Sequence, residues 1–90
     1  MSFSAAAADE RVLDVKCTDD ALVVSLRDGR VISVPLAWYP RLLNAKPAQR
    51  RKWKTAGGGY GIHWPTLDED LSTEGLLRGA PAPKAKVPAK

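Results

Sequence analysis

Cysteine and long apolar runs are scarce in this chain of 90 residues. The single cysteine, Cys17, has no partner for an intrachain disulfide, which fits a reducing cytoplasm. No apolar run approaches the roughly 18 residues of a membrane span. No basic residue precedes the short alanine run near the start, so a signal peptide is not indicated. We therefore expect a cytoplasmic protein without a membrane partner.

Metal ligands are also few. His63 is the only imidazole, whereas a zinc site usually needs several nitrogen or sulfur ligands. Asp68, Glu69 and Asp70 lack the spacing of a calcium-binding loop. The sequence therefore predicts no metal site and no cofactor.

The net charge of +4 is unevenly distributed. Residues 80–90 carry three lysines and no acid, whereas residues 11–79 carry eleven basic and eight acidic side chains. Because the main part of the chain is close to neutral, the total charge is weak evidence for nucleic-acid binding.

The length suits one small domain, which buries only about 60% of the surface that its unfolded chain exposes. We expect a flexible leader over residues 1–10 and a single α+β domain over residues 11–79. Residues 80–90 are rich in Ala, Pro and Lys, cannot bury a core, and are expected to form a disordered tail.

Alternating apolar residues predict a three-stranded antiparallel meander in the first part of the domain. The run Arg11–Cys17 alternates in part, and two further alternating runs flank Asp28 and Gly29. Asp-Gly between such runs is the strongest short hairpin signal, and a type I′ turn would give both residues a positive φ. That turn predicts the register Leu26 opposite Val31, Val24 opposite Ser33, and Val23 opposite Val34.

Two prolines predict two short helices after the meander, because proline suits the first helical position. Pro40 would begin the first helix, with the Leu42–Leu43 pair buried. Pro47 would begin the second, which we expect to run for two turns with Trp53 as its anchor. Lys46 at the N-cap has no side-chain acceptor, so the second helix starts poorly capped.

The residue pattern in the last part of the domain predicts one further short strand and a C-terminal helical turn. The aromatic and β-branched run Tyr60–Trp64 favours a strand, which Pro65 ends. Ser72 is a candidate N-cap for a turn that carries Leu76–Leu77 and ends at Gly79. This order of elements is typical of an α+β fold.

Three consecutive glycines, Gly57–Gly59, raise the possibility of a phosphate-binding loop. Such a loop needs a strand, then the glycine-rich turn, then a helix whose N-terminal amides face the anion. Here the glycines follow a basic helix and precede a strand, and no Gly-Lys-Ser/Thr follows. We interpret them as a sharp turn or a close approach of the backbone.

His63 is a candidate general base, with an acid from Asp68–Asp70 and with Tyr60 or Ser72 nearby. Nothing in the spacing requires this role. In a strand His63 faces away from its two neighbours, so it lies at the surface if they are in the core. We favour a histidine that forms a hydrogen bond or faces a partner, and we predict no enzymatic activity.

A basic segment between positions 41 and 54 contains six basic side chains and no acid. Such a segment can contact nucleic-acid phosphates. It can equally form a solvated helix face that pairs with the acids at 68–74, which is the interpretation that we favour. The six residues are Arg41, Lys46, Arg50, Arg51, Lys52 and Lys54.

Five of the six aromatic side chains lie between positions 38 and 64. In so small a domain they are expected to form much of the core, and any that stay exposed would mark a partner surface. Tyr39 and Tyr60 are the two most expected to show an edge. The predicted partner surface combines these aromatic residues with basic ones: Tyr39, Arg41, Arg50, Arg51, Lys54, Tyr60 and His63.

Three stretches, DGRVISVPLAWYPRLLNA, QRRKW and GGGYGIHWPTLDEDLSTEGLL, together resemble the bacterial domain-of-unknown-function family twenty-four forty-two. The resemblance runs from about Val12 to Gly79, and the joint pattern of WYPRL, GYGIHWP and DEDLS is distinctive. It implies a small α+β domain with no assigned enzymatic activity. It also implies a gene placed beside another small uncharacterised protein, in a toxin–antitoxin-like arrangement. Some longer relatives add a helix-turn-helix domain, for which eleven residues after Gly79 are too few.

Together these observations predict a non-enzymatic interaction module, the antitoxin-like or regulatory partner of another small bacterial protein. Two alternatives stay open. One is a nucleic-acid-binding protein that uses the basic segment 41–54 and the lysine tail. The other is a small hydrolase-like enzyme around His63.

Overall fold

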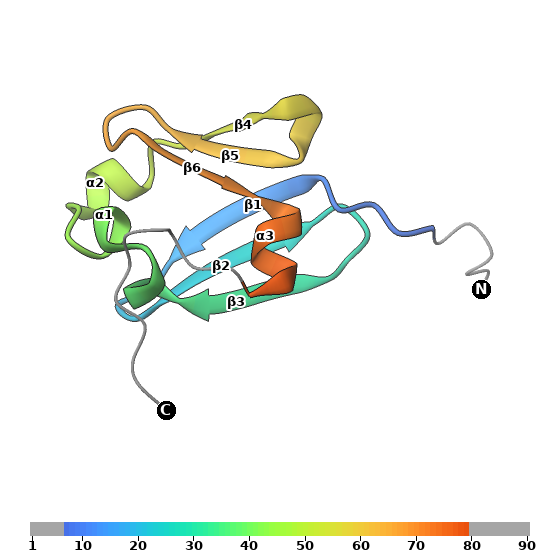
Figure 1. Ribbon diagram of the computed structural model, residues 1–90, viewed down its shortest axis with the longest axis horizontal. Coiled ribbons are helices and arrows are strands. Elements are labelled where there is room, and N and C mark those ends of the chain that lie inside the picture. Colours follow the sequence, from blue (N-terminus) through green and yellow to red (C-terminus); the bar gives the residue numbers. More distant parts are fainter. Residues whose placement is uncertain (1–6, 80–90) are drawn as a thin grey trace.

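The computed structural model describes residues 7–79, which form two three-stranded antiparallel sheets and several short helices (Figure 1). The predicted α+β class is confirmed. The predicted tail at 80–90 and the first six residues of the predicted leader lie outside the described residues.

The first sheet is the predicted meander of β1 (Val12–Cys17), β2 (Ala21–Leu26) and β3 (Val31–Pro35), in the order β1-β2-β3. Alternate residues of β2 are buried and form the centre of the core. The pairing of β1 with β2 shifts between Val12 and Asp14, so Leu13 is an extra residue and is 59% exposed.

The β2–β3 turn contains three residues, one more than predicted. The N–H of Leu26 donates to the oxygen of Arg30, and the N–H of Gly29 donates to the oxygen of Leu26. Gly29 has a φ of 99°, but Asp28 has no positive φ, so the type I′ prediction was wrong. A three-residue loop that ends in glycine is a common alternative hairpin. The predicted register was therefore also wrong, and the observed pairs include Ser25–Val31, Val24–Ile32, Val23–Ser33 and Leu22–Val34.

Both predicted helices begin at the predicted prolines, but the second is shorter than expected. After a 3-10 turn, η1 (Leu36–Trp38), come α1 (Pro40–Leu43) and α2 (Pro47–Arg50), which is one turn long rather than two. Leu42 is buried, but Leu43 is 40% exposed because a four-residue helix turns only one side towards the core.

Capping of α2 agrees with the sequence in part. Lys46 offers no side-chain acceptor, as expected. The side-chain oxygen of Gln49 compensates, because it accepts the backbone N–H of Lys46 at 2.9 Å.

The second sheet contains β4 (Lys54–Ala56), β5 (Gly61–Trp64) and β6 (Glu69–Ser72), with a 3-10 turn, η2 (Gly57–Gly59), between β4 and β5. Only β5 was predicted. It is the central strand and places Ile62 and Trp64, both essentially fully buried, in the core.

The predicted C-terminal turn is α3 (Thr73–Arg78), which packs against β3 (Figure 1). The hydroxyl of Ser72 accepts the N–H of Gly75 at 3.0 Å, and Gly79 ends the helix with a φ of 77°, so both predicted caps are confirmed. Leu76 is buried, whereas Leu77 is 41% exposed. Within residues 7–79, none of the helices has the length and apolar character needed to cross a bilayer.

Candidate functional site

A groove of about 540 Å³ lies between β1 and the segment that runs from the start of α2 to Trp53. One wall consists of six consecutive residues, Asp14–Asp19, and the other of Pro47, Arg50, Arg51 and Trp53. Successive strand residues point to opposite faces of a sheet. A wall made of consecutive residues is therefore the edge of the strand and not one of its faces.

The edge of β1 presents backbone groups to this groove. Thr18 donates its N–H to the oxygen of Ala21 at 2.8 Å, which makes these two a hydrogen-bonded pair. In an antiparallel ladder such pairs alternate with non-hydrogen-bonded ones, so Cys17 and Val15 belong to the second kind. Their N–H and C=O groups point away from β2, towards the groove. Within residues 7–79, no strand pairs with this side of β1.

The groove has apolar side chains and a charged rim. Trp53 is half-buried against the core, and Pro47 lies beside it on the same wall. Burial raises the pKa of the Cys17 thiol, so this group stays protonated at neutral pH and is a poor nucleophile.

Two predicted partner residues, Arg50 and Arg51, line the groove, but they have different roles. The guanidinium of Arg50 donates to the backbone oxygens of Leu42 at 2.8 Å and Leu43 at 2.7 Å, and so satisfies the end of α1. Arg51 and Lys16 are exposed, and neither makes an ion pair with any side chain in the described part of the chain.

Tyr39 and Arg41 lie elsewhere. Tyr39 is 1% exposed, so the prediction that it shows an edge was wrong. Burial raises the pKa of its phenol, and the nearby charge of Glu69 adds to this. Arg41 donates to the backbone oxygen of Asp68, and its guanidinium lies 4.0 Å from the carboxylate of Glu69. It therefore pairs with the acidic run, as the solvated-face interpretation expected.

Glu69 is the one buried acid of this cluster and is 8% exposed. Burial raises the pKa of its carboxyl, and the neighbouring Asp70 and Asp68 raise it further, whereas Arg41 lowers it. Arg41 thus offsets part of the cost of burying this charge, and it holds β6 against α1.

Lys54, His63 and Asp70 lie opposite one another across the three strands of the second sheet. The Nδ1 atom of His63 lies 2.6 Å from the carboxylate of Asp70, and their side chains are 27% and 71% exposed. His63 thus faces away from the core, as strand alternation predicted, and lines no wall of the groove. Tyr60, which precedes β5, is 52% exposed, as expected.

A smaller hollow of about 360 Å³ lies at the glycine turn, where Arg11 and Arg27 also line it. All three glycines have a positive φ, and a Cβ on Gly59 would meet the side chain of Arg11 at 3.2 Å. These residues therefore form the sharp turn and close approach that the sequence suggested.

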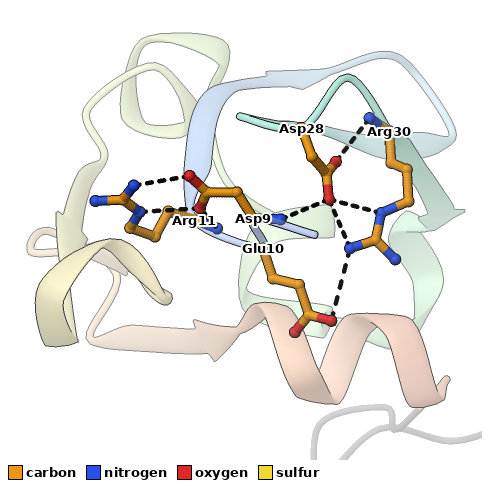
Figure 2. Close-up of polar contacts among 5 residues, drawn as sticks. All are labelled: Asp9, Glu10, Arg11, Asp28 and Arg30. Atoms are coloured by element: carbon orange, nitrogen blue, oxygen red, sulfur yellow. Dashed lines mark hydrogen bonds and ion pairs between the residues drawn. The ribbon is translucent and has the colours of Figure 1, made fainter. Parts of the chain in front are cut away.

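Figure 2 shows the polar contacts that fasten the start of the described chain to the β2–β3 turn. The carboxylate of Asp28 accepts the backbone N–H of Arg30 at 3.0 Å, the guanidinium of the same residue at 2.8 Å, and the backbone N–H of Asp9 at 2.9 Å. Arg11 binds the carboxylate of Asp9 through two nitrogens. Hydrogen bonds from Arg11 lower the pKa of Asp9 to about 2, and those from Arg30 hold the pKa of Asp28 well below its ordinary range.

Of the seven predicted partner residues, Tyr39 is buried and six remain at least partly exposed. Only Arg50 and Arg51 line the groove. Sequence reasoning missed the opposite wall, Asp14–Asp19, because a strand pattern does not reveal whether the strand ends its sheet. Among residues 7–79, no three His, Cys, Asp or Glu side chains gather as a metal site would require.

The comparisons with known proteins agree with this fold. Residues 12–82 match the family described as "Protein of unknown function (DUF2442)". The chain belongs to the DUF2442 family. No curated protein matches it.

Two solved structures are similar to this DUF2442 chain. One is a protein of unknown function from Rhodospirillum rubrum, with 32% identity and a TM-score of 0.69, where the match covers 82% of this chain and 92% of that one. The other is an uncharacterised protein from Chromobacterium violaceum, with 25% identity and the same TM-score, where the match covers 82% of this chain and 70% of that one.

Proposed function

We propose that this DUF2442 chain is a non-enzymatic interaction module that binds another small bacterial protein in the cytoplasm, as the antitoxin-like or regulatory half of a two-protein system. The observation that carries the proposal is the groove beside β1. It offers peptide groups that pair with no strand of residues 7–79 and the apolar side chains of Pro47 and Trp53. It also offers the cations Lys16 and Arg51, which form no ion pair with that part of the chain. Open strand edges of this kind are a common means of binding proteins.

The chemistry of the groove also favours binding over catalysis. Its one thiol, Cys17, has a raised pKa, and Arg50 is held by backbone oxygens. The His63–Asp70 pair lies on the open face of the second sheet and lines neither hollow. A general base needs to reach a bound substrate, and neither of the two hollows would bring a substrate to this pair.

Co-expression with the product of the adjacent gene tests this function. We expect a complex that survives size-exclusion chromatography, and we expect Arg51→Glu to weaken it. Arg78→Glu is the matched control, since Arg78 is an exposed arginine on α3, away from the groove. Recovery of the chain without the co-expressed protein would contradict the proposal.

Nucleic-acid binding is a second candidate, supported by four exposed cations of the basic segment. Lys46, Arg51, Lys52 and Lys54 form no ion pair with the described part of the chain, so they are available to phosphates. The property that would identify this function is an affinity for duplex DNA or RNA that falls steeply as the salt concentration rises. Unchanged retention on both nucleic acids after Arg51→Ala and Lys52→Ala would exclude this role.

A further inference from the structure

We propose that the groove holds one extended peptide segment of the partner, which joins the first sheet as a fourth strand beside β1 and carries acidic side chains at its centre. This inference rests on the proposed function and specifies how the contact is made. In strand addition, backbone hydrogen bonds supply affinity, and alternate side chains supply specificity.

Among the strands that end the two sheets, β1 is the best suited. It has six residues, whereas β4 has three and β6 has four. The five-residue β3 ends at Pro35, which has no N–H, and α3 packs against β3. Along β1, the extra residue Leu13 breaks the regular edge.

The stretch Asp14–Thr18 remains available and spans roughly 13 Å at about 3.3 Å per residue. The backbone groups of Val15 and Cys17 point outwards along it and together offer two N–H donors and two C=O acceptors, while the side chain of Val15 stays in the core.

The opposite wall determines what fits in the groove. The segment from Pro47 to Trp53 faces the strand edge and leaves a slot between them. A single extended chain needs only this slot. A second copy that paired β1 with β1 would bring its whole sheet and its own Pro47–Trp53 wall into the same space. A peptide segment is therefore the better occupant.

The side chains that line the groove determine which peptide sequence fits it. Side chains that point towards Pro47 and Trp53 meet apolar surface. Lys16, which has no ion-pair partner among residues 7–79, lies near the middle of the strand edge, and Arg51 lies on the opposite wall, so both favour carboxylates. Asp14 lies at one end of this edge, and Asp19 lies beyond the other end in the β1–β2 turn, so acids are disfavoured at both ends. The segment is thus apolar at alternate positions and acidic in the middle.

A synthetic peptide provides the probe: acetyl-Thr-Val-Glu-Val-Glu-Val-Thr-amide, titrated into the ¹⁵N-labelled full chain. We expect chemical-shift changes and slowed amide exchange at Val15 and Cys17. Substituting lysine for both glutamates is expected to weaken binding by about fivefold or more. Arg51→Glu is expected to weaken it by about two- to fivefold, while Arg78→Glu leaves it unchanged.

Backbone methylation of the peptide tests strand addition without altering the protein. In an extended chain, alternate residues turn their N–H groups to the same side. One isomer carries N-methyl groups on the first two valines, and the other carries them on the two glutamates. We expect one isomer to bind about tenfold more weakly or worse, and the other to bind almost as well as the parent peptide.

The outcomes separate this inference from the proposed function. Absence of binding, equal loss for both methylated isomers, or changes confined to the second sheet would overturn strand addition, even if the co-expressed partner still binds. A dimer of the chain alone that protects Val15 and Cys17 would also overturn it, because a second copy would then fill the groove. Peptide binding at this edge without a complex with the co-expressed protein would refute only that choice of partner.

Discussion

The indole of Trp64 donates its N–H to the backbone oxygen of Arg50 at 3.0 Å. Trp64 is fully buried on β5, and Arg50 ends α2. This bond therefore links the second sheet to one wall of the groove, directly before the exposed Arg51. The position of that wall depends on the core of the second sheet and not on the short helix alone.

Removal of this link is expected to destabilise the protein. Trp64→Phe deletes the donor and leaves a void, so the free energy of unfolding is expected to fall by about 2–4 kcal/mol. Urea denaturation measures this change. Trp53→Phe is the control, because Trp53 is only half-buried, and its cost is expected to be smaller. Equal losses for the two variants would show that the buried link to Arg50 has no special importance.

Low pH is expected to destabilise the contacts in Figure 2. Asp9 and Asp28 have pKa values in the folded protein below their unfolded value, which is near 4. Their stabilising contribution is therefore complete above about pH 4 and is lost as the pH falls towards 2 and below. Asp28→Asn is expected to lower stability at neutral pH and to flatten this acid-induced decline. A decline as steep as in the parent protein would contradict the role of Asp28.

Glu69 is expected to have the opposite pH dependence. Because its pKa is raised in the folded protein, the folded chain keeps a proton that the unfolded chain has already released. Stability from this group therefore falls as the pH rises from the ordinary glutamate pKa through the raised one. Glu69→Gln is expected to remove this fall, which thermal melts between pH 4 and 8 would measure. A melting temperature with the same pH dependence in both proteins would refute this assignment.

The N-cap of α3 offers a local test of the fold. Ser72→Ala leaves the N–H of Gly75 without its side-chain acceptor and is expected to cost about 1 kcal/mol. Ser33→Ala, at an exposed position of β3, is expected to change stability by about 0.5 kcal/mol or less. Urea titrations of both variants would reveal the difference, and a silent Ser72→Ala would mean that the cap does not stabilise α3.

The sequence predicted the features that depend on the local chemistry of a single residue. Pro40 and Pro47 start helices, and Ser72 and Gly79 cap one, because these preferences are local. The hairpin at Gly29 was found, but its register was not. The Asp28 carboxylate accepts the N–H of Arg30, a contact that fits a longer turn and that the Asp-Gly pair alone does not specify.

Features that depend on neighbours in space were missed. Strand β6 contains Glu69 and Asp70, residues with low strand preference, and it forms because β5 offers it a partner edge. Strand β4 begins at Lys54, inside a stretch that the basic pattern assigned to a helix. Tyr39 is buried because it packs within the core cluster, which its local sequence does not reveal. The open edge of β1 is likewise a property of the sheet and not of the β1 sequence.

The central claim is that the edge of β1 is the contact surface. Its most direct test is amide hydrogen exchange of the complex with the co-expressed partner. We predict that the amides of Val15 and Cys17 exchange more slowly in the complex. The amides of Val31 and Ser33, which face outwards on the opposite edge of the same sheet, should keep their rates. Unchanged rates at Val15 and Cys17, with protection at His63 and its neighbours on the second sheet, would contradict it.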